Sequence, residues 1–92
     1  MTFEWDESKN QSNIKKHGLS FESARRVFLD PLAKVFPDLG SHNEERWKII
    51  GRIGEALVVL TVFTIRDEDA EHYRIISARQ VSTHERRSYE DR

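Results

Sequence analysis

The ten residues "ALVVLTVFTI", positions 56–65, constrain the fold of this chain more than any other stretch. They are apolar at both odd and even positions, so a strand made of them would bury both of its faces. Such a strand must lie in the centre of a sheet and be covered on each side. The preceding segment "ERWKIIGRI" alternates apolar and basic residues, which is typical of a half-buried strand. Gly54–Glu55 between the two segments predicts a two-residue hairpin turn.

Two helices are predicted before this hairpin. Asp6 is a suitable N-cap and Gly18 a suitable left-handed C-cap for a first helix over "ESKNQSNIKKH". Ile14 is the one large apolar residue of this helix, so neighbouring elements must hold it in place. Ser20 can cap a second helix, which ends at Asp30–Pro31 because a residue before proline avoids the helical region. Its apolar positions recur at helical spacing and predict packing against a sheet: Phe21, Ala24, Val27 and Phe28.

Short strands are predicted at "TFEW" and "LAKVF", and a last strand over Tyr73–Ala78 follows the acidic loop "RDEDAE". The pattern S-T-H-E from Ser82 to Glu85 is a capping box that opens a C-terminal helix. Tyr89 is its only large apolar residue, so this helix docks through Tyr89 or is completed by a partner. The predicted fold is α+β, in one domain over residues 1–92. An antiparallel sheet of about four strands packs against two N-terminal helices, with a C-terminal helix after it.

Composition restricts the compartment and the partners. The chain contains no cysteine and no stretch near the roughly 20 apolar residues of a membrane span, so we expect a cytoplasmic protein with no membrane partner. Its net charge of −1 argues against a nucleic-acid surface that covers the whole molecule. The cations nevertheless gather in two segments, residues 9–26 and 74–87, each with a single acid. Such patches are compatible with a local phosphate site or with ordinary solvation of a charged surface.

Motifs for nucleotide, metal or serine chemistry are absent. The four histidines are scattered without metal-ligand spacing, so no metal and no cofactor is predicted. RNA cleavage without a metal requires a base for the 2′-hydroxyl, an acid for the leaving oxygen and fixed positive charge for the phosphorane. The end of the last strand, followed by a helix start, is a suitable place to gather such groups.

Arg79 is the first candidate for the fixed charge because it lies between the strand end and the free amides of the next helix. The competing interpretation is a salt bridge from Arg79 to Glu85. Arg74 is five residues away, so the two arginines face opposite sides of the sheet unless the strand bends near Ser77. Glu85 is explained by the capping box before any catalytic role is needed.

Other candidates lie earlier in the chain. His17, beside Lys16, either stabilises the helix C-terminus as a cation or acts as a general acid or base. His42 lies in a polar loop before Glu45 and Arg46, which could bring these groups to an active face. Trp47 alternates with the apolar residues of its strand, which favours a place in the core over stacking on a base.

Three stretches resemble the BrnT family of type II toxin–antitoxin toxins, whose fold is similar to that of RelE and ParE. "FEWDESKNQSNIKKHGLSFESA" resembles the family pattern F-x-W-D followed by N-x-x-K-H-G-x-x-F-x-x-A. "DPLAKVFPD" with "SHNEERWKIIGRI" matches in the middle, and "YRIISARQVSTHERRSYED" matches at the end. The three stretches occur in the family's order and span nearly the whole chain.

The resemblance implies a metal-independent endoribonuclease that inhibits translation and is neutralised by a BrnA-like ribbon-helix-helix antitoxin. The toxin–antitoxin complex would bind operator DNA through the antitoxin. Within the matching motifs, the expected catalytic residues are Lys16, His17, Arg46, Arg74, Arg79 and Glu85. The expected RNA-binding residues are Lys15, Arg86 and Arg87. The alternative is a toxin-fold module without catalytic activity that acts as a corepressor with its antitoxin.

Overall fold

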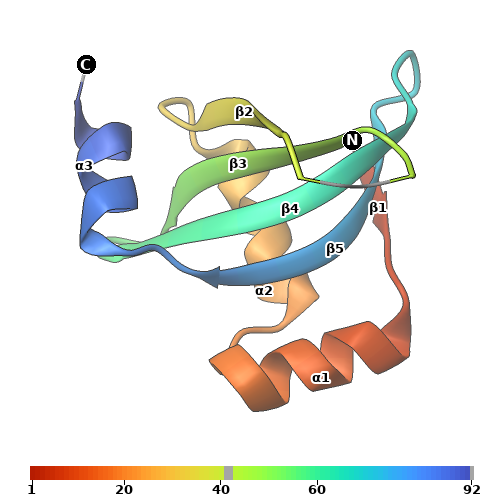
Figure 1. Ribbon diagram of the computed structural model, residues 1–92, viewed down its shortest axis with the longest axis horizontal. Helices are drawn as coiled ribbons and strands as arrows, with labels where there is room; N and C mark the ends of the chain where they lie inside the picture. The colour runs from red at the N-terminus through yellow and green to blue at the C-terminus, as the bar shows by residue number, and fades with distance from the viewer. Residues whose placement is uncertain (41–42, 92) are drawn as a thin grey trace.

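A mixed five-stranded sheet forms the centre of the protein, in the spatial order β1-β5-β4-β3-β2 (Figure 1). The computed structural model describes residues 1–40 and 43–91, and the elements refer to these residues. In chain order they are β1 (Thr2–Glu4), α1 (Glu7–His17), α2 (Phe21–Ala24), the 3₁₀ helix η1 (Arg25–Leu29), β2 (Lys34–Asp38), β3 (Arg46–Ile53), β4 (Leu57–Asp67), β5 (His72–Gln80) and α3 (Thr83–Glu90). No helix in this part of the chain has the length and hydropathy needed to span a bilayer.

The strand pairing corrects the prediction of an antiparallel sheet of about four strands. β2, β3, β4 and β5 do pair antiparallel in series, but β1 adds a fifth strand parallel to β5. Parallel neighbours need a long crossover connection, and here every other element except α3 lies between β1 and β5 in the chain. A local hydrophobic pattern carries no information about such a distant pairing.

The central strand is β4, as the doubly apolar segment predicts. It lies between β5 and β3, and Val58, Val59 and Thr61 are fully buried. The turn before it is longer than predicted, because Ile53 pairs with Leu57 and leaves three residues in the loop. Gly54 takes the left-handed conformation at φ 65°, which a residue with a side chain adopts only with strain.

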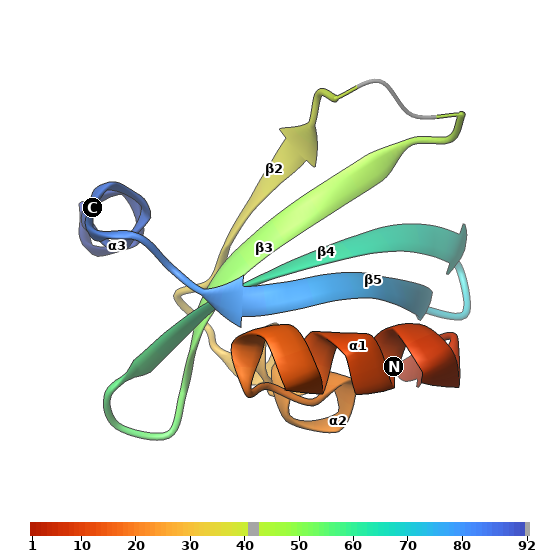
Figure 2. The ribbon, with the colours of Figure 1, turned by 60° about the horizontal axis from the view of Figure 1, so that its bottom comes forward.

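One face of the sheet is covered by α1, α2 and η1 (Figure 2). The predicted second helix is shorter than expected, since α2 has four residues and continues as η1. Val27 of η1 is fully buried against β3 at Gly51. A Cβ atom at Gly51 would lie 2.9 Å from both the Cβ and the carbonyl oxygen of Val27, so only glycine allows this close approach. The main core lies in this layer: Phe21, Val27, Ile49, Val59, Phe63 and Ile75.

Helix α1 has the predicted ends but an unexpected buried side. Asp6 accepts hydrogen bonds from the amides of Ser8 and Lys9, and Gly18 is left-handed at φ 67°. Ile14 is 37% exposed, whereas Asn10 and Asn13 are buried. The Asn10 side-chain oxygen accepts from the amide of Phe21 at 2.9 Å. Hydrogen bonds from buried amides therefore hold α1, in place of an apolar stripe.

Helix α3 packs on the opposite face of the sheet through Tyr89, which is 2% exposed. Tyr89 belongs to a second cluster with Ile50, Val58 and Leu60, and its hydroxyl donates to Asp30. This contact confirms the predicted docking of the C-terminal helix. The helix end is held as well, because the Lys34 ammonium donates to the backbone carbonyls of Ser88 and Asp91.

Candidate functional site

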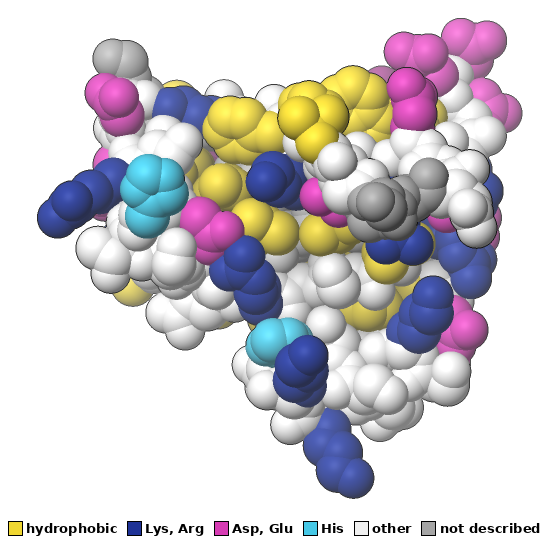
Figure 3. Space-filling model, viewed as in Figure 1, with side chains coloured by type: hydrophobic (Ala, Val, Ile, Leu, Met, Phe, Trp, Pro, Cys, Tyr) yellow, Lys and Arg dark blue, Asp and Glu magenta, His cyan; other side chains and the backbone are white. Residues whose placement is uncertain are grey.

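The α3 face of the sheet is the side opposite α1 and α2, on which α3 docks. It carries cations from two strands among apolar and small polar side chains: Arg46, Lys48, Leu60, Val62, Thr64, Arg74, Ser77 and Arg79. Figure 3 shows this side of the molecule as hollowed, with apolar side chains across it and basic, acidic and His side chains among and around them. The concave surface therefore carries cations together with some carboxylates.

A bulge in β5 places both predicted arginines on the α3 face. Val62 pairs with Ser77 while the next residue, Phe63, pairs with Ile75, so Ile76 is an extra residue in β5. Ile75 and Ala78 both lie in the core on one side of the sheet, although they are an odd number of positions, three, apart. Arg74 and Arg79 consequently both point to the other face. The bend considered near Ser77 is present, and the two arginines share one side.

Arg79 forms a bidentate ion pair with Glu85. Both of its terminal nitrogens donate to the two carboxylate oxygens at 2.7 Å, with side-chain exposures of 41% for Arg79 and 22% for Glu85. Glu85 also accepts from the Ser82 amide at 2.9 Å and completes the predicted capping box. The hydrogen bonds from the Arg79 guanidinium lower the pKa of Glu85 from 4.5 to about 2. A carboxylate that is so firmly ionised is a poor general acid or base near neutral pH.

This ion pair makes part of the stability dependent on pH. Because the pKa of Glu85 is lower in the folded protein, its contribution is present above about pH 4.5 and is lost as the pH falls toward 2. After allowance for solvent screening we expect about 1–2 kcal/mol. Thermal melts between pH 2.5 and 7 should show a steeper acid loss for the wild type than for Glu85→Gln. Parallel acid profiles would contradict this assignment.

Other arginines near this face also have carboxylate partners. Arg74 donates to Glu4 at 2.6 Å, and the second oxygen of Glu4 contacts His72 at 2.7 Å. The hydrogen bond from the Arg74 guanidinium is the main cause that lowers the pKa of Glu4, and the hydrogen bond with His72 is the second. Arg66, near the end of β4, pairs with Glu44 at 3.4 Å. Charge compensation is therefore a general feature of these arginines.

Two cations of β3 differ in this respect. Within residues 1–40 and 43–91, neither Arg46 nor Lys48 forms a salt bridge, although Asp38 lies opposite Arg46 in the strand register. The Nε of Arg46 is buried without a hydrogen-bond partner among these residues. Lys48 was not among the predicted site residues. The alternation of basic and apolar residues along this strand was the available signal, because it placed Lys48 on the same side as Arg46.

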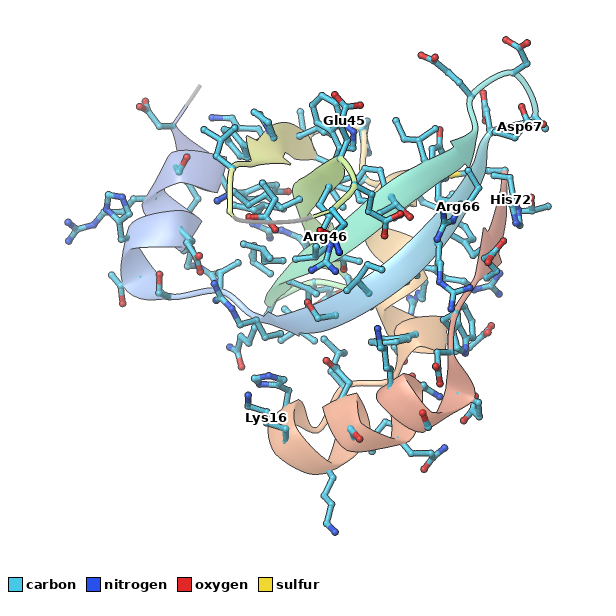
Figure 4. The ribbon with its side chains drawn as sticks, turned by 45° about the vertical axis from the view of Figure 1, so that its right-hand side comes forward. Lys16, Glu45, Arg46, Arg66, Asp67 and His72 are labelled. Carbon is cyan, nitrogen blue, oxygen red and sulfur yellow. The ribbon has the colours of Figure 1, made fainter. Side chains whose placement is uncertain are left out.

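The remaining predicted residues lie at the margins. Lys15, Lys16 and His17 form the exposed last turn of α1, and Figure 4 shows Lys16 there, apart from Arg46 on the sheet. Arg86 contacts Glu90 at 3.6 Å, and Arg87 is exposed on α3. Trp47 packs against the main core, which confirms its predicted structural place. His42 lies outside the described residues.

A groove separates α3 from the sheet and has a volume of about 430 Å³. Its floor and wall are apolar at Phe36, Leu39, Ile50 and Leu60. Lys48 lines it from β3, and His84, Glu85 and Ser88 line it from α3. No group of three or more His, Asp or Glu side chains suited to a metal ion occurs within the described ranges. The groups available on this face are thus its cations, the carboxylates that pair with two of them, and the apolar surface of the groove.

Comparison with known proteins identifies the family of this chain. Residues 5–85 match the family model described as "Ribonuclease toxin, BrnT, of type II toxin-antitoxin system". A solved structure, the 1.1 Å crystal structure of the Brucella abortus ribonuclease toxin BrnT, superposes with a TM-score of 0.69 at 33% sequence identity. The match covers 90% of this chain and 99% of that one. No curated protein matches the chain. The protein therefore belongs to the BrnT family of ribonuclease toxins of type II toxin–antitoxin systems.

Proposed function

We propose that this protein is a metal-independent endoribonuclease that cleaves RNA in the cytoplasm and thereby inhibits translation. The observation that carries the proposal is the set of cations on the concave α3 face, where Arg46, Lys48, Arg74 and Arg79 project from two strands. Fixed guanidinium and ammonium groups on a concave surface are suited to bind the RNA backbone and to stabilise a phosphorane.

The proton transfers need a second set of groups. His17 and Lys16, at the end of α1, are the residues of the matching motif that we propose for these transfers. The ionised state of Glu85 favours a positioning role for it, in which it orients the Arg79 guanidinium. Lys15 at the end of α1 and Arg87 on α3 are exposed, Arg86 on α3 is half-buried, and all three are suited to contact RNA phosphates outside the cleavage point.

Cleavage by this mechanism should continue in a chelator. The purified protein is expected to cut single-stranded RNA equally well with and without millimolar EDTA, because the proposed mechanism uses side chains alone. Gel analysis of a labelled transcript, with a His17→Ala protein as control for contaminating nuclease, measures this. Activity that disappears in EDTA and returns with Mg²⁺ or Zn²⁺ would contradict the metal-free mechanism.

We further propose that a BrnA-like ribbon-helix-helix antitoxin neutralises the protein in a heteromeric complex. Such a partner would cover the α3 face and mask its cations, and the complex would contact operator DNA through the antitoxin. The membership of the family supports an antitoxin partner in general. Co-purification of the tagged protein with the product of the neighbouring gene, followed by a growth-rescue assay, tests the specific partner.

A second candidate function is a corepressor without catalytic activity. It is favoured by one observation, the neutralisation of Arg66, Arg74 and Arg79 by Glu44, Glu4 and Glu85. An arginine that already holds a carboxylate binds a phosphate less readily, since the two anions compete. Induction without antitoxin separates the two functions. Early loss of protein synthesis supports the ribonuclease, whereas normal growth with intact operator binding by the complex supports the corepressor.

A further inference from the structure

The α3 face combines compensated and uncompensated cations, and the difference indicates where a ligand anion would bind. Arg74 and Arg79 each have a carboxylate within 2.7 Å, whereas Arg46 and Lys48 form no salt bridge within the described part of the chain. These two residues are two positions apart on β3, so their side chains project from the same face of the sheet, about 7 Å apart along the strand. An extended polyanion that follows this strand could contact both.

Lys48 is also part of the groove beside α3. The groove adds an apolar surface to this charge, with Phe36 from β2 and Ile50 and Leu60 from the central strands. Its volume of about 430 Å³ lies in the range of small-molecule sites. A ligand that fits this surface needs a flat, largely apolar group next to a negative charge. A base with its adjacent phosphate has these properties, provided that the base is not paired in a duplex.

We propose that this groove binds one unpaired base of a single-stranded RNA, with Phe36 contacting the base and Lys48 contacting the neighbouring phosphate. This inference rests on the proposed ribonuclease function and specifies its substrate as single-stranded. Arg46 contacts the next phosphate along β3. The groove thus sets the position of the RNA relative to Arg79, whose partner Glu85 forms part of the groove wall.

Binding can be measured without cleavage. A fluorescent single-stranded oligonucleotide with 2′-O-methyl groups at every position lacks the attacking hydroxyl, and its anisotropy reports affinity alone. We expect Lys48→Gln to weaken binding about tenfold. The slope of log affinity against log salt concentration should fall by the amount that corresponds to the loss of about one phosphate contact. Phe36→Leu should weaken binding about tenfold, because leucine keeps the apolar volume but offers no ring to the base. Phe36→Tyr should bind as the wild type does.

One control lies on the same strand as Phe36, and a second removes a cation from another element. Val35→Ala changes the exposed neighbour of Phe36 on the other side of β2, and Lys9→Gln removes an exposed cation of α1. Both should bind within twofold of the wild type. A duplex probe of the same sequence should bind weakly to all proteins and should not distinguish Phe36→Leu from Phe36→Tyr. Thermal melts of each variant confirm that the proteins compared are folded.

The outcomes separate this inference from the function on which it rests. A wild type that binds and cleaves RNA, with folded Lys48→Gln and Phe36→Leu proteins equal to it, overturns the groove assignment and leaves the ribonuclease in place. Unchanged RNA binding with lost neutralisation by the co-expressed antitoxin would assign the groove to the antitoxin and also overturn it. A wild type that neither binds nor cleaves RNA overturns the proposed function, and the inference with it.

Discussion

Replacing Arg79 by alanine is expected to slow RNA cleavage about a hundredfold, equivalent to about 3 kcal/mol of transition-state stabilisation. Arg79 lies on the α3 face at the end of β5, and its bidentate pair with Glu85 fixes the orientation of the guanidinium. A side chain with 41% exposure remains accessible to a phosphate despite this partner. Single-turnover cleavage of a labelled RNA measures the effect, and growth arrest on induction should disappear with it.

Two further variants distinguish catalysis from a purely structural ion pair. Arg79→Lys should recover only part of the rate, since an ammonium cannot donate two parallel hydrogen bonds to phosphate oxygens. Glu85→Gln keeps the charge of Arg79 and should retain much more activity than Arg79→Ala. If the pair is only structural, Arg79→Ala and Glu85→Ala will lower stability by similar amounts and leave cleavage nearly normal. A folded, fully toxic Arg79→Ala protein would shift attention to Arg46 and Arg74.

Replacing Asn13 by alanine is expected to lower the free energy of unfolding by about 3 kcal/mol, or the melting temperature by about 15 °C. The Asn13 amide donates to the carbonyls of Leu19 and Ala78, both at 2.8 Å, and accepts from the amide of Ala78 at 3.1 Å. β1 pairs with β5 only at His72–Arg74, so the Asn13 side chain takes the place of a neighbouring strand at Ala78. Its loss leaves buried backbone groups without partners.

Urea unfolding of three proteins tests this role. Asn13→Asp keeps the shape but has no amide donors for the two carbonyls, so it should be at least as unstable as Asn13→Ala. Ser12→Ala, on the exposed side of the same helix, should stay within about 0.5 kcal/mol of the wild type. A stable Asn13→Ala protein would mean that the apolar contacts of α1 suffice to hold it.

The candidate site was only partly predictable from the sequence. Arg46, Arg74 and Arg79 are found on one face, but the shared side of the last two depends on the bulge at Ile76. A bulge changes the alternation of a strand by one residue, and "RIISAR" carries no residue that requires it. The compensation of Arg74 by Glu4 was equally hidden, since 69 intervening residues separate them and only the parallel pairing of β1 brings them together. Lys48 was overlooked because only the three-dimensional structure shows that it lines the groove beside α3 and forms no salt bridge among the described residues.

Local signals in the sequence were sufficient to predict the features that depend on residues close to one another in the chain. The ends of α1 follow from Asp6 and Gly18, the start of α3 follows from Ser82 and Glu85, and the buried central strand follows from its continuous apolar run. Only the tertiary structure decided what holds α1 and which arginines keep an uncompensated charge. From the sequence alone, Asn13 would be assigned to the polar surface of α1. Its hydrogen bonds to Ala78 of β5 join residues far apart in the chain, and such contacts produce no periodic pattern in the sequence.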